Sequence, residues 1–408
     1  MKEKKKMSLA VKTFIGFGLG IVIGLIFGEK ASVIKPLGTI FLNMIKMIVV
    51  PMVFLSITAG VANLKDIKKL RNIGVKVVGL YALTSAISVG IGLLMANLIN
   101  PGKGFDMSAL SEAAEYEEQA MPSVIDTLTN MFPSNIFQAF TDSNMLQIIV
   151  FSIFLGIALI MMGEEGEKIS NAIQLGANAM YKITAIVMEF SPIGVCALLA
   201  DSVGSYGLKI FGPLGKLIMT VYASDVILVF LMYVPMVVFL AKVPMVTFFK
   251  NIWKVWVVTA STTSSSGSLP ITTSVVNDDF HISSELSSFS LPLGATINMN
   301  GGCIYYAAAI VLTAQIYGIT LTPGALLNIV VSTVLVAMGC PGVPGGAIIM
   351  TTILLTNMGL PLEIVGLIAG IFRLIDMANT TFNVTGDVVT TMVVARSENL
   401  YMEEETTV

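Results

Sequence analysis

The stretch TASTTSSSGSLP, residues 259–270, concentrates hydroxyl side chains between two apolar parts of the chain. Such a stretch can bind an anion, or one of its serines can act as a nucleophile. A nucleophilic serine needs a neighbouring base. The chain has one histidine, His281, and no lysine in its last two apolar segments. The stretch therefore favours ligand binding, with an intramembrane enzyme and a serine-rich external loop as weaker alternatives.

The composition indicates a membrane protein. Of 408 residues, 55% are hydrophobic and only 12% are charged, whereas soluble domains carry about 25% charged residues. The net charge of −3 gives no basic field for nucleic acid. Three cysteines do not make a disulfide framework, and a single histidine argues against a zinc site.

Apolar runs of membrane-spanning length predict six crossing segments in the first part of the chain. They lie near 8–28, 36–62, 74–99, 135–162, 172–205 and 212–241. We expect the first to be an uncleaved helix whose glycines, Gly16, Gly20, Gly24 and Gly28, form a packing face. Lysines before the first segment, between the second and third, and after the sixth place those ends in the cytoplasm.

The pattern changes after about residue 245, where polar and glycine-rich tips interrupt the apolar segments. The tips are TASTTSSSGSLP (259–270), SLPLGATINMNGG (290–302), MGCPGVPGGA (338–347) and FNVTGD (382–387). Irregular backbone at membrane depth is tolerated only where it is buried or lines a cavity, and paired interruptions indicate a transporter site. Helix starts at such tips attract a carboxylate. We expect Gly267 to permit the first turn and Pro270 to begin the returning helix.

The motifs SSSGSLP, LPLGATINMNGG, GVPGGA and NVTGD, in this order, resemble those of the glutamate and neutral amino acid transporters, the sodium:dicarboxylate symporters. The resemblance implies an all-α polytopic fold with eight transmembrane helices and two re-entrant hairpins, built from inverted repeats, working as an elevator and forming a homotrimer. It divides the chain into scaffold helices (1–72 and 125–208), a transport-domain helix (73–100), an acidic extracellular loop (101–124), the remaining transport domain (209–395, with hairpins at about 245–279 and 322–357) and a cytoplasmic tail (396–408).

The resemblance also assigns the substrate site, in which an Asp of the last helix accepts hydrogen bonds from a substrate ammonium. That Asp is Asp376, and a carboxylate inside a membrane is a functional candidate by default. Pairing with Arg373, three residues earlier, is the structural alternative. The implied substrate set is Thr263, Ser264, Ser265, Ser266, Val343, Ala347, Asp376, Asn379, Thr380 and Asn383.

Asn379 stands where acidic amino acid transporters of this family place an arginine. An amide cannot neutralise a second carboxylate, and an unpaired buried carboxylate costs several kcal/mol. The sequence therefore predicts a small neutral substrate such as serine, threonine or alanine. Arg373 is the one nearby residue that would restore acidic specificity, so an acidic amino acid or dicarboxylate symporter stays an alternative.

The same resemblance implies sodium sites built from oxygen ligands. Their residues are Tyr81, Thr84, Ser85, Gly294, Thr296, Asn298, Asn300, Ala337, Met338, Cys340, Asn383 and Asp387. The family motif NMDGT reads NMNGG here, so Asn300 replaces a carboxylate of the third site. That site then holds sodium weakly, or transport uses fewer sodium ions.

Asp225 lies inside the sixth apolar segment, where the family pattern has no carboxylate. It could replace the lost charge, carry a proton, or pair with Arg373. A proton-coupled or cation-independent carrier is therefore an alternative to sodium-coupled uptake, although Tyr306 stands where proton-coupled animal relatives carry a Glu. We expect a multi-pass protein of the bacterial cytoplasmic membrane, with lipid and an amino acid as partners, no nucleic acid and no enzymatic activity.

Overall fold

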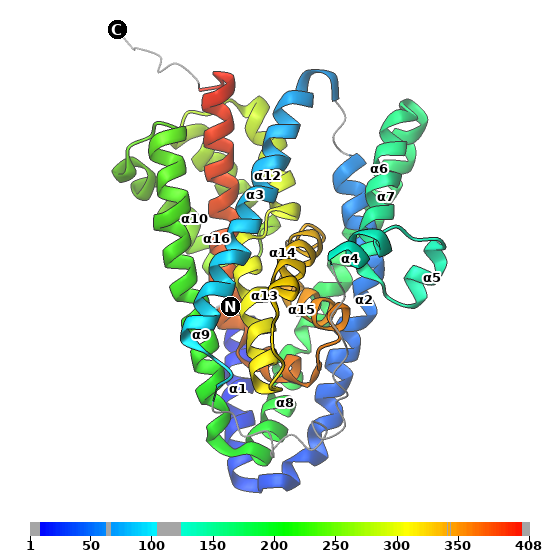
Figure 1. Cartoon of the computed structure of the whole chain (residues 1–408), viewed down its shortest axis with the longest axis vertical. Coiled ribbons are helices and arrows are strands. Elements are labelled where there is room, and N and C mark those ends of the chain that lie inside the picture. Colours follow the sequence, from blue (N-terminus) through cyan, green and yellow to red (C-terminus); the bar gives the residue numbers. More distant parts are fainter. Residues whose placement is uncertain (1–8, 63–66, 104–123, 341, 343, 402–408) are drawn as a thin grey trace, which may run out of the picture.

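The computed structural model describes residues 9–62, 67–103, 124–340, 342 and 344–401, and in these residues the named elements are all helices (Figure 1). The first half contains α1 (Leu9–Phe27), α2 (Lys35–Ala62), α3 (Ile67–Ile99), α4 (Val124–Asn130), α5 (Ile136–Thr141), α6 (Met145–Met161), α7 (Glu164–Glu189) and α8 (Ser191–Tyr206). The second half contains α9 (Phe211–Leu228), α10 (Met245–Thr262), α11 (Leu269–Ser274), α12 (Ser284–Ile297), α13 (Asn300–Ile316), α14 (Pro323–Ala337), α15 (Gly346–Asn357) and α16 (Glu363–Glu398). The acidic residues predicted to form an external loop lie mostly in 104–123, outside the described residues.

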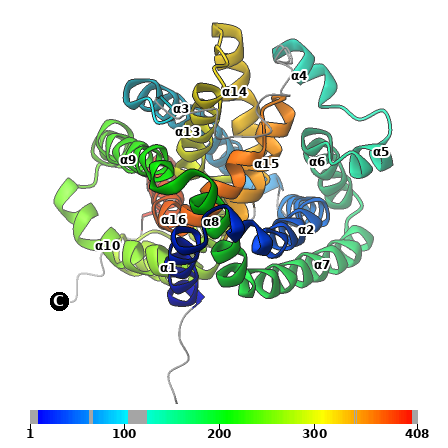
Figure 2. The same ribbon diagram turned by 90° about the horizontal axis from the view of Figure 1, so that it is seen from below.

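The helices form two sides around α16. Figure 2 shows α2, α6 and α7 on one side and α3, α9 and α10 on the other. α2 packs against α6, α7 and α8, while α16 packs against α10, α12 and α13. The helix that carries more candidate site residues than any other helix therefore lies inside the molecule, where it can bury polar side chains.

Helix α1 lies against α8 through the predicted glycine face. A Cβ added to Gly20 would lie 2.6 Å from the carbonyl oxygen of Cys196, and one on Gly24 would lie 2.8 Å from that of Ala200. Gly28 contacts α8 with its backbone instead, because a Cβ added to Gly204 would lie 2.3 Å from the carbonyl oxygen of Gly28, whereas no atom lies within 4 Å of a Cβ added to Gly28 itself. The small residues let two helices of the same chain approach closely.

The predicted segment 172–205 contains two helices, α7 and α8, which are bent by 49° at the break between them and form either one broken span or a re-entrant loop. Pro192 lies in the first turn of α8, where a proline is tolerated because its missing N–H would have no helical partner. The predicted segment 135–162 is also divided, since α5 ends at Thr141 and Ser143 has a φ of 53°.

Three of the four predicted interruptions are confirmed. α10 and α11 form one helical hairpin (hairpin one), and α14 and α15 form a second (hairpin two), each broken at the expected tip. A third break separates α12 from α13 at Asn298 and Met299. Hairpin one begins and ends near the C-terminal end of α16, because the amide of Ser283 donates to Leu400 O over 2.9 Å.

Hairpin two starts from the opposite end of the molecule. The chain reaches it from the end of α13, where the hydroxyl of Tyr317 donates to Glu363 Oε2 at the start of α16 over 3.0 Å. The two hairpins therefore approach each other from opposite ends, and their tips can meet halfway along α16.

The prediction that FNVTGD interrupts the last segment is wrong, because α16 continues through it for 36 residues. Gly386 has another role. A Cβ on it would lie 2.6 Å from Asn300 Nδ2 and 2.7 Å from Asn298 Nδ2. The glycine lets a continuous helix approach the α12–α13 break closely.

Among the described residues, five helical stretches are long and apolar enough to cross a membrane: Val11–Met44, Ile73–Ile99, Phe211–Leu240, Ser284–Ile316 and Glu363–Glu398. The bent α7–α8 pair adds a sixth if it is one span. The polar residues of α16 are thus placed within membrane-spanning structure.

Candidate functional site

The two hairpin tips meet at Gly342. Its carbonyl oxygen accepts the hydroxyl of Ser264 at 2.9 Å and the amide of Ser266 at 3.0 Å. A Cβ on Gly342 would lie 2.2 Å from the carbonyl oxygen of Ala295. Only glycine fits here, and the arrangement is a closed one in which each tip covers the other.

The turn of hairpin one uses Thr263 instead of the predicted Gly267. Thr263 caps α10 in the left-handed region, with φ 50° and ψ 39°. Gly267 is needed for its size, because an added Cβ would lie 3.0 Å from the Ser264 hydroxyl oxygen. Pro270 stands in the first turn of α11, as predicted.

Arg373 holds the tip of hairpin one. Its guanidinium donates to the Thr263 hydroxyl and, over 3.1 Å, to the Ser261 carbonyl oxygen. The ion pairs considered from the sequence, with Asp376 or Asp225, are not what holds this side chain. Arg373 instead fixes the irregular end of α10, where helical carbonyls lack intrahelical partners.

Asp376 faces the tip of hairpin two. Its Oδ2 accepts the amide of Gly345 over 3.2 Å, and Gly345 has a φ of 82°, which favours glycine. Asp376, Arg373 and Gly345 line a cavity of about 30 Å³, enough for one water. Ala347 is buried in the following turn of α15. The carboxylate therefore lies where both hairpins end.

Asn379 lies on the same face of α16, three residues after Asp376 and four before Asn383. It is only 1% exposed, and neither atom of its amide group has a hydrogen-bond partner among the described residues. Thr380, one turn beyond Asp376, is also buried. A buried amide without partners costs about 1–3 kcal/mol, which makes Asn379 a candidate for ligand binding.

A set of oxygens converges beside the α12–α13 break. Asp387 Oδ1 accepts Asn298 Nδ2 at 2.7 Å, and the carbonyl of Asn383 accepts the same amide nitrogen at 3.2 Å. Asn298 Oδ1 is buried without a partner. A Cβ on Gly294 would lie 2.3 Å from Asp387 Oδ1, so backbone and carboxylate are close. Carboxylate, amide and carbonyl oxygens are the ligands that a hard cation prefers.

The side chain of Asn300 is fully engaged. Its Oδ1 accepts the Ser85 hydroxyl at 3.1 Å, and its Nδ2 donates to the hydroxyl of Tyr233 at 2.9 Å. Tyr233 in turn donates to the Phe382 carbonyl at 2.8 Å. The remaining α3 residues of this predicted site bond elsewhere: the Tyr81 hydroxyl donates to Ser290 O (2.9 Å) and the Thr84 hydroxyl to Tyr81 O (3.2 Å). The amide joins three elements where the family motif has a carboxylate.

The residues of the predicted second sodium site are only partly brought together. Thr296 and Met338 line the same apolar cavity of about 260 Å³, which lies between α2 and α6 on one side and α12 and hairpin two on the other. The Thr296 hydroxyl donates to its own helix, at Leu293 O (2.8 Å). The carbonyl of Ala337 accepts the amide of Cys340 at 3.0 Å.

Several groups that complete the site are not predicted from the sequence. They are the carbonyl of Gly342, the amide of Gly345, the hydroxyl of Tyr233 and the sulfur of Met299. The Met299 sulfur accepts a hydrogen bond from Asn383 Nδ2 at 3.2 Å. Tyr233 ends a π-helical turn, Val229–Tyr233, that an apolar run does not reveal. Val343 lies outside the described residues.

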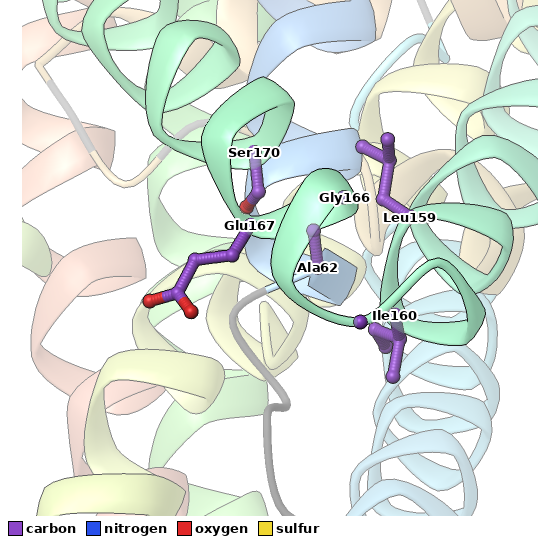
Figure 3. A pocket seen from close by; sticks show the side chains of 7 residues that line it. Ala62, Leu159, Ile160, Gly166, Glu167 and Ser170 are labelled. Atoms are coloured by element: carbon purple, nitrogen blue, oxygen red, sulfur yellow. The ribbon is translucent and has the colours of Figure 1, made fainter.

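A further pocket of about 150 Å³ lies where the end of α2 meets the α6–α7 turn. Figure 3 shows its wall, with the carboxylate of Glu167 pointing away from the other lining side chains. None of its lining residues belongs to the predicted substrate or sodium sets.

Sequence comparison agrees with this geometry. Residues 9–397 match the sodium:dicarboxylate symporter family. The chain is 34% identical to a proton/sodium-glutamate symport protein of Geobacillus stearothermophilus, over 98% of this chain and 97% of that protein. It is 31% identical to a proton/glutamate-aspartate symporter of Bacillus subtilis (98% and 97%) and 28% identical to a C4-dicarboxylate transport protein of the same organism (97% and 95%).

These relatives are transporters, and the spans of the chain place it in the bacterial cytoplasmic membrane as a multi-pass protein. With its broken helices, meeting hairpins and polar α16, the chain belongs to the sodium:dicarboxylate symporter family as a secondary symporter.

Proposed function

We propose that this protein couples inward sodium movement to uptake of a small neutral amino acid such as serine, threonine or alanine. The substrate ammonium binds Asp376, and its carboxylate binds the hairpin-one tip with Asn383. The observation that carries the substrate assignment is Asn379, a buried amide with no partner for either polar atom. It can donate to and accept from a hydroxyl but cannot neutralise a carboxylate.

Arg373 supports the neutral assignment by its position. Its guanidinium is already held by Thr263 and the Ser261 carbonyl. Turning it towards a substrate carboxylate would free the end of α10. The residue left to contact the substrate side chain is therefore Asn379.

An acidic amino acid or C4-dicarboxylate is the second candidate. The named relatives are glutamate, aspartate and C4-dicarboxylate transporters. Arg373 lines the same small cavity as Asp376, so a modest rotation would present its charge to a ligand there.

For the coupling ion, the proposal rests on the oxygens around Asp387. The unpartnered Asn298 Oδ1 and the adjacent Gly294 backbone supply further ligands for one sodium ion. Asn300 argues for fewer sodium ions than three sites would hold, because its amide oxygen already accepts the Ser85 hydroxyl and its amide nitrogen already donates to Tyr233. Carriage of a third ion would require breaking both bonds.

We also propose an elevator mechanism in a homotrimer. The mobile unit would be α3, α9, α12, α13, α16 and both hairpins, moving against α1, α2 and α6–α8. The large apolar cavity between α2–α6 and α12–hairpin two supports this division, because a sliding contact cannot be packed as tightly as a fixed core.

The test is uptake of labelled serine and labelled aspartate into proteoliposomes, with and without an inward sodium gradient. We expect sodium-driven serine uptake and little aspartate uptake. Asn379→Arg should reverse the preference by about tenfold or more, since it adds a cation for a second carboxylate. Asn379→Leu, the uncharged control, should lose serine without gaining aspartate. Sodium-driven aspartate uptake by the unmodified protein would instead establish the acidic candidate.

A further inference from the structure

Asp225 is a buried carboxylate that belongs neither to the substrate site nor to the sodium sites described above. It lies in α9, within the apolar stretch Phe211–Leu240, and is 0% exposed. Neither of its oxygens has a hydrogen-bond partner among the described residues. An unpaired carboxylate in such a place costs several kcal/mol if it is charged. Something must neutralise it, either a bound proton or a cation.

The surroundings of Asp225 favour a proton. Two tyrosines of the same helical stretch, Tyr222 and Tyr233, lie near it. The titratable side chains buried on the helices packed against α9, namely α3, α13 and α16, are Tyr81, Cys303, Tyr305, Tyr306, Asp376 and Asp387, and Arg373 on α16 is half-buried. None of these donates a hydrogen bond to Asp225. Lys216, also on α9, donates to Lys103 O over 3.4 Å.

A metal ion would need several converging oxygens. Among the described residues, no group of three or more His, Cys, Asp and Glu side chains that could hold a metal ion includes Asp225. A proton needs only the carboxylate itself, which it converts into a neutral acid that can remain buried.

Asp225 lies, along the chain, between two residues that bond to α16. One is on α9 and the other is in the π-helical turn that follows α9. The Tyr222 hydroxyl donates to Leu374 O at 2.8 Å, and the Tyr233 hydroxyl donates to Phe382 O at 2.8 Å. Leu374 is two residues before Asp376. The π-helical turn ending at Tyr233 lies between the two bonds, and such turns occur often at functional sites. These bonds connect the surroundings of Asp225 to the helix that carries Asp376.

We propose that Asp225 is a proton-binding site of the transport cycle. It binds one proton from the outer solution together with the substrate and releases this proton inside. The step is a simple binding: an O–H bond forms at one carboxylate oxygen on loading and the same bond breaks on release. The proposal rests on the transport function proposed above and adds a proton to its coupling.

The experiment measures substrate-driven acidification inside proteoliposomes with a trapped pH dye, alongside serine counterflow, in which no net proton movement is needed. Asp225→Asn, which mimics the neutral acid, should keep counterflow within about twofold and lose at least about tenfold of the acidification. Asp201→Asn is the matched control, because Asp201 lies on α8 and pairs with Lys35 (3.6 Å). It should retain both activities.

A second readout does not depend on transport. Infrared spectra of the purified protein at neutral pH should contain the carbonyl stretch of a protonated carboxylic acid, absent from Asp225→Asn and retained in Asp201→Asn. An unchanged spectrum in Asp225→Asn, or acidification that survives this substitution, would overturn the proposal. So would sodium-driven serine uptake by the unmodified protein without any acidification, and that result would leave the proposed function standing. If the unmodified protein takes up no serine but shows the infrared band, the result counts against the proposed substrate, and the protonated state of Asp225 stands.

Discussion

Asp387 and Asn300 show at the scale of single residues how one atom changes what a site can hold. Both contact the α12–α13 break from neighbouring positions. Asp387 offers a carboxylate oxygen to Asn298 Nδ2 and leaves other oxygens nearby. Asn300 has an amide nitrogen in place of a second oxygen, and this nitrogen finds a neutral acceptor in Tyr233. The first set attracts a cation, and the second is satisfied without one.

Asp387→Asn should raise the sodium concentration for half-maximal serine uptake by about tenfold or more, because it removes the carboxylate charge opposite the cation. The asparagine is nearly the same size and can still accept from Asn298 Nδ2. Sodium titration of uptake measures the effect. Asp201→Asn should leave the titration unchanged, and an equal shift in both variants would refute the assignment of Asp387.

The side chains of the candidate site are easier to predict from the sequence than its backbone groups. The sequence predicts Asp376 and Asn379 as site residues, and the structure buries both on one face of α16. The sequence could not identify the Gly342 carbonyl or the Gly345 amide, because every residue carries these groups and only the tertiary fold selects them. It also could not aim Arg373, since helical spacing allowed Asp376 as a partner as readily as Thr263.

At the scale of elements, the contact of α1 with α8 depends on residues that lack side chains. Gly16, Gly20 and Gly24 each approach α8 backbone so closely that an added Cβ would lie within 3 Å of a carbonyl oxygen. Gly18, on another face of α1, meets nothing within 4 Å. The pair Gly20 and Gly18 therefore separates packing from helix propensity within one helix.

Gly20→Ala should destabilise the protein by about 1–3 kcal/mol, because the backbone of α8 must move away. Gly18→Ala should be neutral or should stabilise by about 0.5–1 kcal/mol, since alanine is the better helix former. Thermal unfolding in detergent compares the two. Equal melting temperatures would show that the α1–α8 contact is not tight.

The sequence predicted helix breaks where polar or glycine-rich tips interrupted apolar runs, and three of the four were found. It failed at NVTGD because a buried polar stretch can stay helical when its side chains find partners inside the protein. Thr385, for example, accepts a hydrogen bond from Trp256 Nε1 at 2.8 Å. The sequence did not reveal the 49° bend at Phe190, because the apolar run continues through the bend.

At the scale of the whole molecule, the two sides of the protein contact each other across an apolar cavity of about 260 Å³. An empty apolar space forfeits dispersion contacts, so it weakens the attachment of one side to the other. For a protein whose two sides are proposed to slide, weak attachment lowers the barrier to movement.

Gly60→Leu should fill this cavity, because the nearest atom to an added Cβ is Thr296 Oγ1 at 3.9 Å. Burying a leucine there would stabilise the present arrangement by about 1.5–3 kcal/mol. Turnover should fall by about tenfold for each 1.4 kcal/mol added to the barrier. Single-turnover uptake, with melting temperature measured in parallel, tests this.

Gly79→Leu is the control for the cavity variant. Gly79 is exposed on α3 and meets nothing within 4 Å. Gly79→Leu should stabilise the protein only by the helix-propensity gain of about 0.5–1 kcal/mol that Gly60→Leu shares, and it should leave the turnover unchanged. A Gly60→Leu protein with faster turnover would show that filling the cavity does not raise the barrier to movement of the two sides.

The tip of hairpin two carries a thiol, Cys340, that is 4% exposed and accepts a hydrogen bond from the Tyr306 hydroxyl at 3.4 Å. If the tip leaves Ser264 and Ser266, this thiol becomes open to alkylating reagents, whereas Cys303 stays inside α13. With the half-buried Cys196 replaced by serine, the alkylation rate becomes a natural reporter of how often the tip of hairpin two leaves Ser264 and Ser266. Any compound that holds the two tips together would slow that rate, so ligands could be screened in detergent without a membrane or a radiolabel.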